Sequence, residues 1–222
     1  MSSVVPHRFL FRYTFPVRHL QPLPKKGKQL LDLPEECILP DLSELDRAEP
    51  FGELRLAWNE SGLGTSVSVA AKKHPLVCDV AFPEEADGLQ VWLDTRNTQS
   101  IHRASRFCHH FCLLPQGGGS KQDQPVAIQL PIARARDDAP IADSAEIPLS
   151  VKKTKAGYKL EAWFPAEILN GFDPESNQLI GFYYYLRDAE LGEQFLTVDK
   201  EFPFASDPSL WSTLELVTSN ER

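Results

Sequence analysis

The densest group of metal-binding residue types lies at residues 108–112, which read CHHFC, with His102 close by. Cysteine thiolates and imidazoles are the usual ligands of zinc. On a strand, Cys108 and Cys112 share one face but stand about 13 Å apart, because the chain rises about 3.3 Å per residue. Both therefore cannot bind one ion at about 2.3 Å, and Cys108 with His110 would need ligands from elsewhere. We expect a buried strand with half-buried histidines and no bound metal.

Three aspartates at expected strand ends are the candidates for calcium: Asp87, Asp94 and Asp188. Calcium takes six to eight oxygen ligands, and no EF-hand spacing is present. We expect these aspartates to be solvated carboxylates in turns, and the residues themselves indicate no cofactor.

Motifs of known catalytic chemistry are missing from the sequence. It has no GxSxG or HExxH motif, and residues 117–121 (GGGSK) lack the spacing of a phosphate-binding loop. Glycoside hydrolysis needs two carboxylates about 5–10 Å apart, and no such pair stands out among the many acidic residues. We expect no catalytic residue and no enzymatic activity.

Aromatic residues in the expected strands are candidates for a binding face. Trp92 alternates with apolar neighbours and shares a face with Gln90, while Tyr183, Tyr185 and Arg187 share a face of a later strand. An aromatic ring beside such polar groups suits a polyol, although packing of the rings in the core or beneath the N-terminal residues is the more frequent outcome. Three more aromatics are expected in loops, where binding residues concentrate: Phe82, Phe202 and Phe204.

Short alternating apolar runs separated by turn signals predict about nine strands in an all-β sandwich or barrel. The runs lie at residues 54–58, 67–69, 89–93, 107–114, 147–151, 158–164, 179–186, 195–198 and 214–217. The one helical piece expected is residues 166–169, with Pro165 at its start and Gly171 at its end. We therefore expect two antiparallel sheets and minimal helix.

The domain organisation follows from a change of pattern near residue 50. Residues 1–50 form an N-terminal extension expected to pack on the sandwich, and residues 51–222 form the sandwich. Alternating aromatics over residues 9–15 predict a short edge strand in the extension. Residues 116–124 are expected to form a flexible polar loop, and residues 134–144 a charged one.

Composition excludes several classes of protein. The chain has 222 residues and a net charge of −8, so nucleic acid is disfavoured as a partner. No apolar run approaches the roughly 20 residues of a membrane span, so no membrane partner is expected. Residues 1–16 do not read as a signal peptide, which predicts a cytoplasmic protein. The four cysteines are few and irregularly spaced, so free, reduced thiols are expected.

Four segments, in order, carry a resemblance to the family 9 carbohydrate-binding modules, within the broader DOMON-like group. They are residues 54–64 (LRLAWNESGLG), 87–97 (DGLQVWLDTRN), 157–169 (GYKLEAWFPAEIL) and 180–188 (IGFYYYLRD) with 208–216 (PSLWSTLEL). The resemblance covers about residues 51–218. Each motif alone is degenerate, and their order and spacing together are moderately specific.

The resemblance implies a jelly-roll-like sandwich of about eight to ten strands that binds sugars by stacking on aromatic rings. Some members hold structural calcium. We therefore expect a non-catalytic module for a glycan or small polar ligand. The alternative is a structural or protein-interaction sandwich that has lost sugar binding, and a small enzyme is a third and weaker hypothesis. An exposed aromatic flanked by unpaired polar groups favours the first reading, and a filled surface favours the second.

The expected site lies at the end of the sandwich formed by the turn after Asp94 and the loop before Trp211, where the resemblance places the contacts of the family. Polar side chains there would bond hydroxyls and phenylalanines would face a sugar ring. Changing Arg96 or Phe204 to Ala is expected to keep the fold and weaken binding. The expected site residues are Trp92, Arg96, Asn97, Arg187, Phe202 and Phe204.

Overall fold

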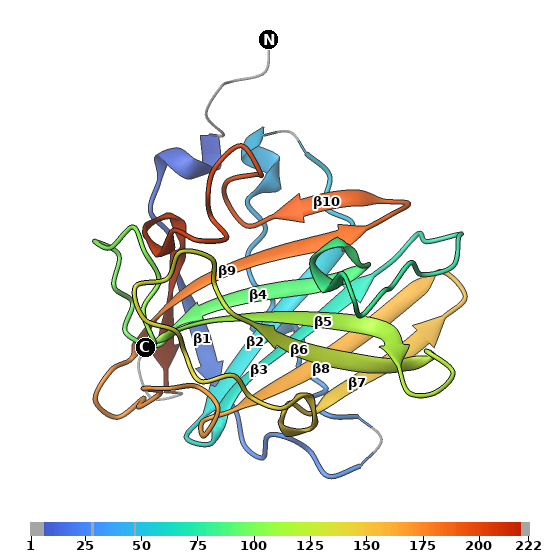
Figure 1. The fold of residues 1–222 in the computed structure, drawn as a ribbon, viewed down its shortest axis with the longest axis horizontal. Helices are drawn as coiled ribbons and strands as arrows, with labels where there is room; N and C mark the ends of the chain where they lie inside the picture. The colour runs from blue at the N-terminus through green and yellow to red at the C-terminus, as the bar shows by residue number, and fades with distance from the viewer. Residues whose placement is uncertain (1–6, 28, 47, 219–222) are drawn as a thin grey trace.

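The computed structural model describes residues 7–27, 29–46 and 48–218 (Figure 1). Within these residues the chain forms eleven β-strands and six short 3-10 helices. The prediction of an all-β fold with little helix is confirmed. None of the helices in this part of the chain is long and apolar enough to cross a membrane.

All eleven strands lie between residues 14 and 217. They are β1 (Thr14–His19), β2 (Gly52–Asn59), β3 (Gly62–Val69), β4 (Gly88–Asp94), β5 (Cys108–Gly118), β6 (Gln124–Leu130), β7 (Leu149–Thr154), β8 (Gly157–Pro165), β9 (Leu179–Asp188), β10 (Gly192–Phe195) and β11 (Ser212–Val217). The 3-10 helices are η1 (His7–Leu10), η2 (Glu35–Cys37), η3 (Ser43–Asp46), η4 (Pro83–Glu85), η5 (Ser144–Glu146) and η6 (Pro208–Leu210).

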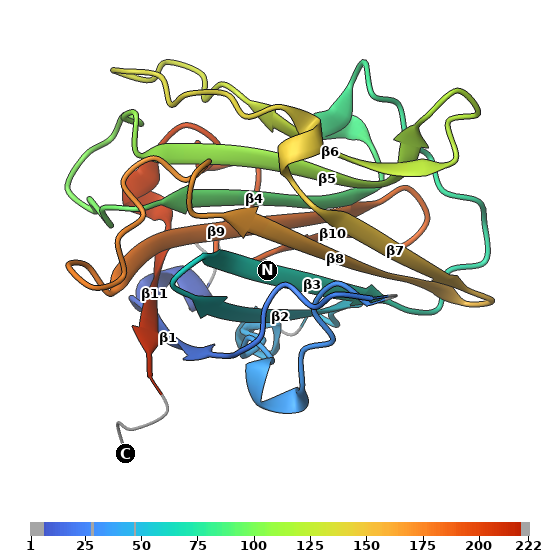
Figure 2. The same ribbon diagram turned by 90° about the horizontal axis from the view of Figure 1, so that it is seen from below.

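The strands hydrogen-bond in the order β6-β5-β4-β9-β11-β1-β2-β3-β8-β7, with β10 added to β9. Figure 2 shows the result as two layers, which β11 and β1 join at one side. The terminal strands β6 and β7 also contact each other, so the sheet nearly closes on itself. The expected jelly-roll topology is therefore not confirmed, because one barrel-like sheet takes the place of two separate ones.

Strand β1 departs from the expected antiparallel pattern, because it pairs in parallel with both β11 and β2. The edge strand expected over residues 9–15 is also wrong: η1 precedes the strand, and β1 lies inside the sheet with Phe15 and Val17 buried. Its paired residues in β2 and β11 stand about 40 and 200 positions further along the chain, a separation that local alternation cannot reveal.

Residues 20–27 and 29–37 run over the outer side of β2, β3 and β8. Leu31 and Leu33 pack there against Ala57 and Trp163 in an apolar cluster separate from the main core. The carboxylate of Glu161 on β8 fixes this segment, because it accepts the backbone N–H groups of Leu30, Leu31 and Asp32 at 3.0, 3.3 and 3.0 Å. This segment therefore packs on the outer side of the sheet, while β1 is part of the sheet.

Two local predictions need correction. Residues 166–169 form successive turns, closed by the N–H of Ile168 on the Pro165 carbonyl at 3.1 Å, because four residues are too few to nucleate an α-helix. The loop expected at 116–124 is a hairpin: β5 continues to Gly118, and β6, which was not predicted, begins at Gln124. Strand β6 is a sheet edge whose outward apolar residues stay partly exposed, so its pattern is weak.

Candidate functional site

The outward face of β4, β5 and β9 carries a row of aromatic and polar side chains. Side chains alternate along a strand, so Trp92 and Gln90 of β4 point away from the inward-facing residues at 89, 91 and 93. The register places His110 of β5 and Tyr183 of β9 directly opposite Trp92. Pairing thus brings an indole, an imidazole and a phenol onto one face from three separate stretches of sequence.

The rings of this row pack against one another closely. The Trp92 and His110 rings stack with centroids 4.1 Å apart and planes 8° apart. Phe204, from the loop after β10, meets Trp92 edge-on at 5.4 Å and stacks on Tyr183 at 4.6 Å. The indole N–H of Trp211 donates to the Phe204 carbonyl at 2.8 Å and fixes that loop. Trp92 and Phe204 are only 1% and 5% exposed, so they form a rigid floor.

A short hydrogen-bond chain runs beside the rings. Gln90 donates from Nε2 to the Glu84 backbone carbonyl at 2.9 Å, which leaves its Oε1 to accept from His110 Nε2 at 3.1 Å. Burial lowers the pKa of His110 to about 3, so the imidazole is neutral at ordinary pH. The Trp92 Nε1–H is buried and has no partner among the described residues. The indole of Trp92 has no other hydrogen-bonding group, so its ring is held by packing alone among the described residues.

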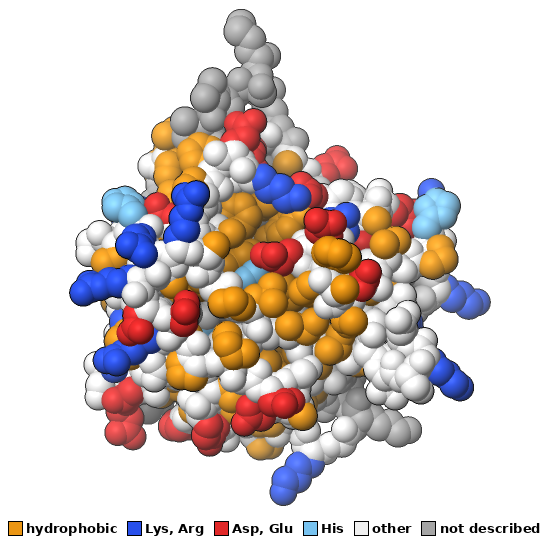
Figure 3. Space-filling model, viewed as in Figure 1, with side chains coloured by type: hydrophobic (Ala, Val, Ile, Leu, Met, Phe, Trp, Pro, Cys, Tyr) orange, Lys and Arg blue, Asp and Glu red, His pale blue; other side chains and the backbone are white. Residues whose placement is uncertain are grey.

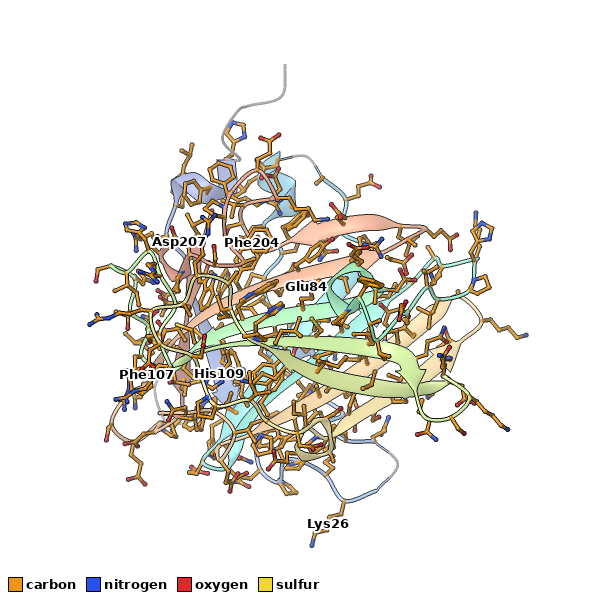
Figure 4. All side chains as sticks on the ribbon, in the orientation of Figure 1. Lys26, Glu84, Phe107, His109, Phe204 and Asp207 are labelled. Carbon is orange, nitrogen blue, oxygen red and sulfur yellow. The ribbon has the colours of Figure 1, made fainter. Side chains whose placement is uncertain are left out.

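The space-filling view shows that this face is hollowed. Hydrophobic side chains line the hollow, a histidine lies at its centre, and an acidic side chain crosses it (Figure 3). Phe204 and Glu84 lie over the strands β9 and β4 on this face (Figure 4). Glu84 belongs to η4 and follows Phe82, which is 62% exposed. We refer to the floor of Gln90, Trp92, His110 and Phe204, with a rim formed by η4 and its N-cap residue Phe82, as the sheet-face hollow.

Arg96 and Asn97 lie at the strand end where the sequence placed them, and both serve the local fold. The Arg96 guanidinium lies 5.0 Å from the centre of the Phe107 ring. Asn97 has a φ of 48°, a left-handed conformation that asparagine tolerates, and its Oδ1 accepts from the Thr213 hydroxyl at 3.2 Å. The cavity at this end measures about 90 Å³. That is below the range of about 300–1,000 Å³ that is usual for small-molecule sites.

Arg187 and Phe202 lie elsewhere. In the antiparallel pair of β4 and β9, Asp94 faces Gly181 while Arg187 faces Gly88, so Arg187 is about 20 Å along the strand from the Asp94 turn. The expectation that Arg187 reaches the same end is wrong. Phe202 packs against Phe9 with ring centroids 5.4 Å apart. Of the six expected site residues, the fold therefore brings Trp92 and Phe204 into direct contact and keeps the other four apart from that pair.

The carboxylates at strand ends are engaged by groups of the protein itself. Asp87 and Asp188 flank the ammonium group of Lys72, which lies 3.3 Å from one and 2.8 Å from the other and occupies the place of a cation. Asp94 accepts the backbone N–H groups of Arg96 and Thr98. Within the described residues, no three His, Cys, Asp or Glu side chains gather closely enough to hold a metal ion.

The thiols are poor ligands and nucleophiles. Burial raises the pKa of Cys78 to about 11 and that of Cys108 to about 12, and it raises the pKa of Cys112 further. The thiolate is the form that binds metals and attacks electrophiles, so these groups are inert at neutral pH. The absence of zinc and the reduced state of the cysteines stay predictions.

Comparison with known proteins gives a match in structure but not in sequence. Neither the protein-family models nor the curated proteins match the chain. A family 9 carbohydrate-binding module from Caldicellulosiruptor kristjanssonii, solved with glucose, is similar with a TM-score of 0.63 and 13% identity, over 95% of this chain and 98% of that one. The same module solved with cellotriose gives a TM-score of 0.62 and 14% identity, over 94% and 96%.

A protein from Bacteroides uniformis to which carbohydrate binding is ascribed is also similar, with a TM-score of 0.55 and 12% identity, over 93% of this chain and 100% of that one. The chain therefore has the fold of family 9 carbohydrate-binding modules, as the resemblance between their motifs and residues 51–218 predicted. The extent of the match shows that residues before 51 belong to the shared fold as well.

Proposed function

We propose that this protein is a non-catalytic module that binds a saccharide or a similar polyol at the sheet-face hollow. The observation that carries the proposal is the fold, which is shared over 94–95% of the chain with a module solved in complex with glucose and with cellotriose. Low sequence identity leaves the ligand to be inferred from the residues of the hollow itself.

The rim of the hollow supplies the two kinds of contact that a sugar needs. Phe82, at 62% exposure, offers an apolar face on which the C–H side of a pyranose ring can stack. The exposed carboxylate of Glu84 accepts hydrogen bonds from hydroxyl groups. Beneath them, the stacked Trp92 and His110 rings form a floor that does not rearrange on binding, which lowers the entropic cost.

The contacts of the buried acidic side chains support a non-catalytic role. Asp94 holds a turn, Glu161 holds the N-terminal segment, and Asp87 and Asp188 neutralise Lys72. Each is committed to a structural contact, so none is free to serve as a general acid or a nucleophile. The neutral His110 lies in the floor with its Nε2–H given to Gln90.

One observation favours the alternative, a protein-interaction domain with a lost sugar site. Trp92 and Phe204 are almost fully buried, so the aromatic rings of the floor are covered by their neighbours. Val80 and Phe82, in the segment that leads into η4, are exposed and apolar, as expected of a contact surface for another protein. Titration with sugars decides between the two.

The experiment is isothermal titration of the intact chain with glucose and with cellotriose. Two variants remove rim contacts, Phe82→Ala and Glu84→Ala, and each is expected to weaken binding about tenfold, the effect of one lost charged hydrogen bond or stacked ring. The matched controls are Phe11→Ala, which removes a ring of 60% exposure elsewhere, and Glu35→Ala, which removes an exposed acid that follows a proline in η2.

Weakened binding in both rim variants, with unchanged affinity in both controls, supports the sheet-face hollow as the saccharide site. Binding that is lost in Phe11→Ala and kept in the rim variants would move the site to the small cavity beside Tyr13 and Trp211, which Phe11 also lines. No heat of binding for either sugar at about 10 mM refutes the saccharide proposal and favours the protein-interaction role.

A further inference from the structure

A second cavity lies at another part of the sheet, where residues 72–76 meet the end of β5 and the β7–β8 hairpin. Its volume is about 360 Å³, within the range of about 300–1,000 Å³ that is usual for small-molecule sites. The lining residues that can carry positive charge are Lys72, Lys73, His74, Lys153 and Lys155. No carboxylate side chain lines this cavity, in a chain whose net charge is −8.

Three of these lysines have charges that the protein does not neutralise. Lys72 is paired with the buried Asp87 and Asp188. Lys73, Lys153 and Lys155 are exposed and form no ion pair with any residue that the structure describes. The carboxylate of Glu190 lies close by, and its oxygens accept the backbone N–H groups of Lys73 and His74. The cavity therefore keeps an excess of positive charge.

A buried donor lies in the wall of the same cavity. Tyr158 is 2% exposed, and its hydroxyl makes no hydrogen bond with a described residue. Burial and the nearby Asp188 and Asp87 raise its pKa, so the phenol keeps its proton and can donate. An oxygen atom of a bound molecule that reached this hydroxyl would supply the partner that it lacks.

The lysines are held on segments that are fixed to one another. The Lys72 N–H donates to the Ala156 carbonyl in the β7–β8 turn at 3.0 Å. Gly157 has a φ of +153°, and a Cβ there would come within 1.9 Å of the Val69 carbonyl oxygen, so only glycine permits this close approach. The Lys153 ammonium donates to Gln116 Oε1 on β5 at 2.8 Å. The backbone segments that carry the positive groups are thus positioned before any ligand arrives.

We infer that this cavity, the lysine pocket, binds a small oxyanion. Ammonium groups and a phenolic donor around a preformed space recognise phosphate, sulfate or carboxylate oxygens. The ligand is either a free inorganic anion or the carboxylate of an acidic sugar, since both present the same oxygens. The pocket shares no lining residue with the sheet-face hollow, so it is a separate site that stands whether or not neutral sugars bind.

The test is isothermal titration of the intact chain, at low ionic strength, with inorganic phosphate and with glucuronate. The charge variants are Lys153→Gln and Lys155→Gln, and Tyr158→Phe removes the buried hydroxyl without changing the ring. Lys26→Gln is the control, because Lys26 is exposed and lies away from the pocket (Figure 4). Each lysine variant is expected to weaken binding about tenfold, Tyr158→Phe to weaken it several-fold, and Lys26→Gln to leave it unchanged.

Tighter binding of phosphate than of glucuronate identifies a free anion as the ligand, and the reverse identifies an acidic sugar. The inference is overturned if neither anion gives saturable binding, or if Lys26→Gln weakens binding as much as Lys153→Gln does. Titration of the Lys153→Gln variant with glucose separates the two sites, because that variant leaves the sheet-face hollow intact.

Discussion

Acid is expected to destabilise this protein through two histidines that burial keeps neutral. His109 and His110 are 1% and 3% exposed. Desolvation lowers the pKa of His109 to about 4 and that of His110 to about 3. In the unfolded chain both groups return to the ordinary value of about 6.5. The unfolded state therefore takes up protons below pH 6.5 that the folded state does not, and stability is lost as the pH falls.

The size of the effect follows from proton linkage. Well below pH 6.5, each such histidine costs about 1.4 kcal/mol of stability per pH unit until the pH nears its folded pKa. Between pH 7 and pH 5 the loss is about 2 kcal/mol for each residue and about 4 kcal/mol for the pair. That is a large share of the roughly 5–15 kcal/mol by which proteins are stable.

The assay is urea denaturation of the parent chain and of the variants His109→Gln and His110→Gln at pH 7, 6 and 5. The parent is expected to lose about 2.5 kcal/mol between pH 6 and pH 5, and each variant about half of that, because one titrating group remains. The slope against pH is the readout, since each substitution also changes the stability at pH 7. Equal slopes in all three proteins, or a parent stability that is constant from pH 7 to pH 5, would refute the reasoning.

Three more predictions concern the packing of Phe204, the hydrogen bonds of Glu161 and the state of the cysteines. Phe204→Ala is expected to lower the free energy of unfolding by about 3 kcal/mol, since it empties the space beside Trp92; a loss below about 1 kcal/mol in urea denaturation contradicts this. Glu161→Ala leaves three backbone N–H groups unpaired, so it is expected to lower the free energy of unfolding by about 3 kcal/mol and to speed proteolysis within residues 20–36. Glu167→Ala, the control at an exposed position, is expected to change neither. All four cysteines are expected to be reduced and metal-free, and to react with a thiol reagent at pH 7 only after denaturation; a zinc adduct in native mass spectrometry counts against this.

Alternation along single strands was enough to predict the fold class and much of the floor of the site. The run of residues 89–93 shows from the sequence alone that Trp92 and Gln90 share one face and the apolar residues the other, because side chains alternate with a period of two. The order of four motifs similarly pointed to the family 9 fold, which the structural neighbours confirm. Strand β6 and the internal position of β1 were missed, because an edge strand and a parallel pairing leave no local pattern.

Which residues meet across the sheet was decided only by the tertiary structure. Strand register sets His110 against Trp92 and sends Arg187 to the far end from Asp94. In the sequence, residues 108–112 looked like a zinc motif and gave no sign that an imidazole stacks on an indole. Lys73 is likewise far in the chain from Lys153 and Lys155, and a backbone hydrogen bond between Lys72 and Ala156 brings the two segments together. Such contacts depend on strand pairing over long separations, and a local pattern of residue types does not encode that pairing.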